Sequence, residues 1–144
     1  MDSLLAPLLA LTGHCFVAEI SPGTTDEHCF NSVYDGRHVR DVHVVTKGNR
    51  VVYQGETIYS VEGAAIALTY FSSTGGIGRG TALLAPDDWR FTMTMRATSS
   101  AKLTPITVRW NWQGATSYTV SGGHEPVTYR RTVKLPSPPV RQRR

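Results

Sequence analysis

Long apolar runs are missing from this 144-residue sequence, in which no stretch reaches the roughly 18 consecutive apolar residues of a membrane-spanning helix. The opening segment, residues 1–11 (MDSLLAPLLAL), is apolar only over a short distance, carries the acidic Asp2 and has no positively charged start, so it does not fit a secretory signal. We therefore expect no membrane partner. We expect a cytoplasmic location, or a periplasmic one if a leader is missing.

Charged residues are also few, at 18% of the chain, and much of the net charge of +4 comes from arginines at its end, namely Arg141, Arg143 and Arg144. A surface that follows a nucleic-acid backbone spreads Lys and Arg along one face, with aromatic side chains between them. The sequence shows no such arrangement. We expect no nucleic-acid partner.

Only two cysteines are present, Cys15 and Cys29, on either side of a turn-forming cluster at residues 21–25. A symmetric hairpin would place them opposite each other, about 4.5–5.5 Å apart, which is within the range of a disulfide. A register change of one residue would point them to opposite faces of the sheet. Two alternatives therefore stay open: a disulfide, or two reduced and buried thiols, which a cytoplasmic location favours.

Alternation of apolar and polar residues is what the sequence has in abundance, and it is clearest at residues 89–96 (WRFTMTMR). Such a period of two predicts a strand with one buried and one solvated face. Short connections rich in Gly, Asp, Asn and Pro separate the segments, so consecutive strands should pair as hairpins. The expected strands lie near residues 14–20, 27–34, 37–46, 50–59, 64–73, 77–84, 88–97, 104–113, 116–121 and 126–135.

These strands predict an all-β protein, an antiparallel up-and-down barrel of about eight to ten strands with a short N-terminal helix. The leucines of residues 4–11 would let that helix close one end of the barrel. We expect residues 1–135 to form a single barrel domain and the Pro- and Arg-rich residues 136–144 to form a flexible tail. Alternation assigns the following residues to the inner face: Trp89, Phe91, Met93, Met95, Ile106, Val108, Trp110, Trp112, Val127, Tyr129, Arg131, Val133 and Leu135.

The order of a short apolar helix, the segment 11–16 (LTGHCF) and an unbroken series of strands resembles the lipocalin-like, or calycin, barrels, in particular small uncharacterised bacterial members. Gly13 matches the glycine of their Gly-x-Trp signature, and Cys15 stands in the place of the Trp. The segment 26–59 looks like the part by which one such bacterial group is recognised. The resemblance implies a lipocalin-like barrel, and fold more strongly than function.

One branch of these barrels, the nitrobindins, binds haem through a histidine near the C-terminus. The late histidine of this chain, His124, lies in a Gly-rich turn and not on an inward strand position. We therefore expect no haem and no other cofactor. A metal would need three histidines among His14, His28, His38 and His43, or two with a carboxylate, on one face, and we expect no metal site.

The function we expect is binding of a small hydrophobic or amphipathic molecule in the barrel interior. Residues 39–45 place a charged or ionisable side chain on either face, so at least one such group lies inside. The expected polar contacts are Arg40, His43, Tyr59 and Arg79. The expected apolar contacts are Trp89, Phe91, Met93, Met95, Trp110, Trp112 and Tyr129.

Other functions remain open. Asp41 could pair with an arginine while His43 and Glu56 face solvent, which leaves no polar site inside. An isomerase or hydrolase on the same barrel would use His43 and Asp41, although we assign no catalytic residue. A barrel filled by its own side chains would act through its outer face, as a structural or interaction protein and possible homodimer.

Overall fold

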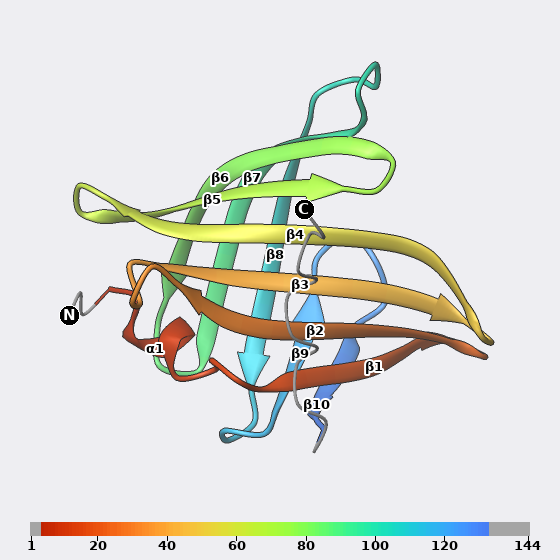
Figure 1. Cartoon of the computed structure of the whole chain (residues 1–144), viewed down its shortest axis with the longest axis horizontal. Coiled ribbons are helices and arrows are strands. Elements are labelled where there is room, and N and C mark those ends of the chain that lie inside the picture. The colour runs from red at the N-terminus through yellow and green to blue at the C-terminus, as the bar shows by residue number, and fades with distance from the viewer. Residues whose placement is uncertain (1–3, 133–144) are drawn as a thin grey trace, which may run out of the picture.

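Ten antiparallel strands form a closed barrel in the computed structural model of this protein, which describes residues 4–132 (Figure 1). Each strand pairs with the next along the chain, and β10 pairs with β1 to close the barrel. The predicted all-β, up-and-down barrel is confirmed. The elements are α1 Ala6–Leu9, β1 Cys15–Ser21, β2 Thr24–Val33, β3 His38–Lys47, β4 Arg50–Glu62, β5 Ala65–Ser72, β6 Gly75–Leu84, β7 Asp88–Thr98, β8 Thr104–Trp112, β9 Ser117–Ser121 and β10 Val127–Arg131.

The alternation in the sequence sets the two faces of each strand. In β7, Trp89 and Phe91 are buried while Arg90 and Thr92 are exposed. Trp89 lies directly opposite Trp110 of β8, so the large aromatic rings meet inside the barrel. In β10, Tyr129 is buried as expected, but Arg131 is exposed. Val133, Leu135 and the tail 136–144 lie outside the described residues.

The N-terminal helix α1 lies at the end of the barrel where β1 begins (Figure 1). Leu5 and Leu8 are completely buried and belong to the same apolar core as Phe16 and Trp89. The expectation that leucines of this segment close one barrel end is therefore confirmed. Among residues 4–132, no helix has the length and apolar character that crossing a membrane demands.

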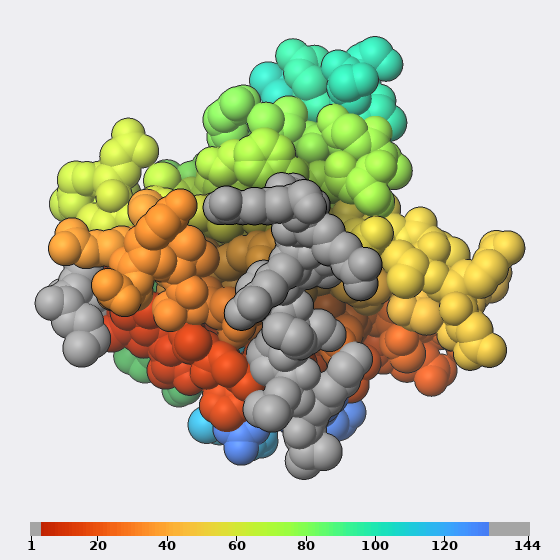
Figure 2. All heavy atoms as spheres, viewed as in Figure 1, coloured from red at the N-terminus to blue at the C-terminus, as the bar shows by residue number. Residues whose placement is uncertain are grey.

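The opposite end of the barrel is formed by the β1–β2, β3–β4, β5–β6, β7–β8 and β9–β10 connections. The β7–β8 connection, residues 99–103, projects well beyond the neighbouring strands, as the teal segment at the top of Figures 1 and 2 shows. No helix covers this end within the described part of the chain.

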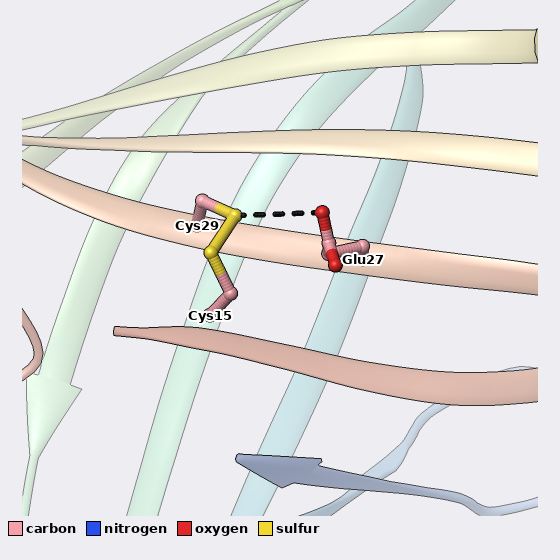
Figure 3. Close-up of side chains that lie close together, drawn as sticks. All are labelled: Cys15, Glu27 and Cys29. Atoms are coloured by element: carbon pink, nitrogen blue, oxygen red, sulfur yellow. Dashed lines mark hydrogen bonds between the residues drawn. A yellow bond between two sulfur atoms is a disulfide. The ribbon is translucent and has the colours of Figure 1, made fainter. Parts of the chain in front are cut away.

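Cys15 and Cys29 are directly paired on β1 and β2, with a Cα–Cα distance of 4.1 Å, and form a disulfide on the outer face (Figure 3). The alternative of two reduced thiols is therefore not what the structure shows. The carboxylate Oε1 of Glu27 lies 3.7 Å from Cys29 Sγ. A disulfide sulfur has no proton to donate, so this approach is a contact between the two atoms, and it becomes a hydrogen bond only when Cys29 is reduced.

Candidate ligand-binding cavity

A cavity of about 680 Å³ lies inside the barrel and extends toward the end opposite α1, where Gly122, Gly123 and His124 border it. One side is apolar and comes from β7, β8 and β9. The other side is polar and comes from β2, β3, β4, β5 and β10. The apolar side comprises Phe91, Met93, Met95, Ile106, Val108, Trp110 and Val120, and the polar side comprises His28, Asp41, His43, Tyr53, Thr57, Tyr59, Tyr70 and Tyr129.

The polar side begins with the pairing of β2 and β3, where His28 lies directly opposite His43. Their imidazole rings stack with centroids 4.8 Å apart and an angle of 18° between the ring planes. Asp26 and Asp41 lie two residues before each histidine, and side chains two residues apart in a strand share a face. The register of one hairpin therefore brings two histidines and two carboxylates to the same place.

Asp26 is the centre of this hydrogen-bonded group, although the side chain is almost fully buried. Its carboxylate accepts hydrogen bonds from His28 Nε2 at 3.1 Å, from His43 Nδ1 at 3.0 Å and from the Tyr129 hydroxyl at 2.7 Å. The other ring nitrogen of His28, Nδ1, donates to both oxygens of Asp41 at 2.8 and 2.9 Å. Both buried carboxylates are thus partnered, as burial of charge requires.

The network continues from His43 toward the mouth of the cavity. His43 Nε2 lies 2.8 Å from the Tyr70 hydroxyl, which lies 2.7 Å from the Tyr53 hydroxyl. Gly55 faces His43 across the β3–β4 pair, and a Cβ at this position would come within 2.5 Å of His43 Nε2 and would also collide with Tyr70. The absence of a side chain at position 55 therefore makes room for the hydrogen bond between His43 and Tyr70.

Burial and the neighbouring charges shift the pKa values of His28 and Asp26 in opposite directions. Burial alone would lower the pKa of His28, but the nearby charges of Asp41 and Asp26 and the hydrogen bonds to them raise it to about 10. Burial alone would raise the pKa of Asp26, but hydrogen bonds from His28 and His43 hold it well below its usual range. At neutral pH a positive His28 thus lies between two carboxylates.

Two tyrosine hydroxyls of the same wall stay protonated over the physiological pH range. Burial raises the pKa of Tyr129 far above its ordinary value, and the negative charge of Asp26 adds to the effect. Burial and the hydrogen bond with Tyr53 likewise raise the pKa of Tyr70 far above its ordinary value. Both hydroxyls therefore act as hydrogen-bond donors as well as acceptors.

The structure places most of the expected ligand contacts on the wall of the cavity. The expected contacts that line it are His43, Tyr59, Phe91, Met93, Met95, Trp110 and Tyr129. Trp89 and Trp112 also lie inside the barrel, but they border a separate cavity of about 390 Å³ next to α1.

The interior placement expected for the two arginines is wrong. Arg40 follows the inward-facing Val39, so it points outward, where it forms an ion pair with Glu56 at 2.9 Å. Arg79 lies between Gly78 and Gly80 in β6 and is exposed on the outer face. The alternative in which Asp41 pairs with an arginine is not what the structure shows, because its partner is His28.

Four residues of the site, Asp26, His28, Tyr53 and Tyr70, are not among the ligand contacts expected from the sequence. The signal for the first two is the spacing Asp26-x-His28-x-Phe30. It places a carboxylate and an imidazole on the same face of the strand as the buried Phe30. The expected strand began at residue 27 and thus left Asp26 outside. Comparison with known protein families gives no match for this chain, and comparison with curated proteins gives none either.

Proposed function

We propose that this protein binds a small, partly hydrophobic molecule inside its barrel, as lipocalin-like barrels do. The observation that carries the proposal is a cavity of about 680 Å³ with one apolar and one polar wall. This volume lies within the range of roughly 300–1,000 Å³ of small-molecule sites, which are mostly apolar with a few convergent polar groups. A barrel filled by its own side chains would lack such a space.

The two walls indicate how such a molecule would lie. Its apolar part would pack against Phe91, Met93 and Trp110, and its polar group would reach the hydroxyls of Tyr53 and Tyr70. Because Arg40 and Arg79 face outward while two carboxylates face inward, the wall that residues 4–132 build offers no arginine to a carboxylate head group. We therefore propose a ligand whose polar end is a hydroxyl, a carbonyl or an amine.

Binding can be tested with N-phenyl-1-naphthylamine, a neutral amphipathic fluorophore whose emission rises in apolar surroundings. We expect saturable binding of one equivalent. Val108→Trp places a bulky ring in the cavity and should weaken binding at least tenfold, whereas Leu83→Trp, on the exposed outer face, should not. Equal affinity of both variants would place the fluorophore elsewhere.

Native mass spectrometry of protein purified gently from its own host provides an independent test. A co-purifying small mass, lost in Val108→Trp and kept in Leu83→Trp, would identify the natural ligand. Repeated absence of any such mass, together with no saturable uptake of the fluorophore, would contradict the proposal.

A catalytic function is the second candidate, and a specific contact favours it. His43 is oriented by Asp26 at Nδ1, and its Nε2 reaches the cavity side beside Tyr70, which is the arrangement of a general base with an orienting carboxylate. The orienting residue is thus Asp26 and not Asp41. Turnover of ester or enone substrates that His43→Gln abolishes and His38→Gln preserves would support an isomerase or hydrolase.

The disulfide bears on the compartment in which the protein works. Disulfides persist in oxidising compartments such as the periplasm and are rare in the cytoplasm. We therefore propose the periplasmic alternative. Alkylation of free thiols in intact cells of the host, followed by mass measurement, checks this: a mass increase at Cys15 and Cys29 would show that both are reduced and would contradict it.

A further inference from the structure

We propose that Asp26, His28 and His43 bind a divalent transition-metal ion of the zinc type inside the barrel. The three side chains come from the paired strands β2 and β3, and their candidate ligand atoms lie within 4.8 Å of one another. Two imidazoles and one carboxylate are a ligand set that zinc sites with an open position commonly use. The spacing Asp-x-His on one strand, with a histidine directly opposite on the next, supplies this set.

The distances within the group suit a shared ion. Ligands held at about 2.0–2.2 Å in a tetrahedral arrangement lie roughly 3.3 Å from each other. His28 Nε2 already lies 3.1 Å from Asp26 Oδ2, and His43 Nδ1 lies 3.0 Å from Asp26 Oδ1, so the two imidazoles approach the two oxygens of one carboxylate. The rings stack with their centroids 4.8 Å apart. Both imidazoles must therefore tilt toward Asp26 when the ion replaces the protons of their hydrogen bonds to this carboxylate.

The outer nitrogen of each histidine is also held in the way that metal ligands require. Metal-binding histidines usually donate the other ring N–H to a carboxylate, a carbonyl or another oxygen, which fixes the ring and its tautomer. His28 Nδ1 contacts the Asp41 carboxylate, and His43 Nε2 contacts the Tyr70 hydroxyl. Both rings therefore present their remaining nitrogen to Asp26.

Charge balance favours a cation at this point. Asp26 and Asp41 bring two carboxylates into the interior, and both side chains are nearly inaccessible to solvent. A positive His28 balances one of these two charges, whereas a divalent ion would balance both with both imidazoles neutral. Because His28 and His43 border the main cavity, the open coordination position would face it and could take a water molecule or an oxygen of a bound molecule.

Titration of the untagged, EDTA-treated full-length protein with Zn²⁺ in a calorimeter tests the proposal. We expect one equivalent to bind. His43→Gln and Asp26→Asn should each weaken binding by about 100-fold or more, since even loss of an outer partner costs about 10–100-fold. The matched control is His38→Gln, which removes an imidazole whose partner is Ser60 outside the group.

A measurement on the unaltered chain keeps the test decisive if a variant fails to fold. Nitrogen-15 shifts of the imidazole rings should change for His28 and His43 when Zn²⁺ is added, and not for His14, His38 or His124. Binding of no ion at micromolar Zn²⁺, or shifts confined to the latter three residues, overturns the proposal. Uptake of the naphthylamine is measured separately without metal, so the two proposals can fail independently.

Discussion

Replacing Gly55 by alanine should destabilise the protein through the polar wall of its cavity. The added Cβ would come within 2.5 Å of His43 Nε2 and would also collide with Tyr70, so these rings must separate. Overpacking of a tightly packed interior costs about 1–3 kcal/mol, and the lost hydrogen bond between His43 and Tyr70 adds about 1 kcal/mol. We therefore expect Gly55→Ala to lower the free energy of unfolding by about 2–4 kcal/mol.

Urea unfolding followed by tryptophan fluorescence measures this change, and Gly78→Ala is the matched control. Position 78 also faces inward, but the nearest atom to its Cβ would be Sδ of the flexible Met93 side chain, at 3.2 Å. The next two, Tyr70 Cβ at 3.5 Å and the Thr94 carbonyl oxygen at 3.6 Å, are at ordinary contact distances. We expect a loss of no more than about 1 kcal/mol there, since alanine also lowers the entropy of the unfolded chain. Equal stabilities of wild type and Gly55→Ala would refute the reasoning.

Two further predictions concern stability. Reduction of the disulfide, whose cysteines are 14 residues apart, should lower the free energy of unfolding by about 3 kcal/mol; a urea midpoint unchanged by reductant would contradict this. In metal-free protein, the raised pKa of His28 stabilises the fold. This stabilisation is complete below pH 6.5, the ordinary pKa of a histidine, and is lost as the pH rises through about 10. The lowered pKa of Asp26 also stabilises the fold, and that stabilisation is lost under acidic conditions. Urea midpoints measured from about pH 2 to 10 check both, and His28→Gln should flatten the alkaline decline.

The barrel could be predicted from the sequence because apolar and polar residues alternate within a strand, which shows which of its faces is buried. Trp89 and Phe91 alternate with polar residues, and short connections decide which strands are neighbours. The polar site could be predicted only in part, because it depends on register between strands. Residues 39–45 carry charged or ionisable side chains on both faces, so alternation alone left open whether Arg40 or Asp41 lies inside. The burial of Val39 and Val45 decided in favour of Asp41.

The energetic cost of the polar wall is itself an argument for function. Burying Asp26 and Asp41 removes hydration worth several kcal/mol for each ion, and their hydrogen bonds and charges offset much of this loss. Apolar side chains of similar volume at such positions usually give equal or greater stability, so stability alone does not require this network. The opposite wall, built around Phe91 and Trp110, shows that apolar packing closes the same barrel. The polar groups are therefore not explained by stability alone, which supports the proposals of a bound molecule and of a metal ion at this wall.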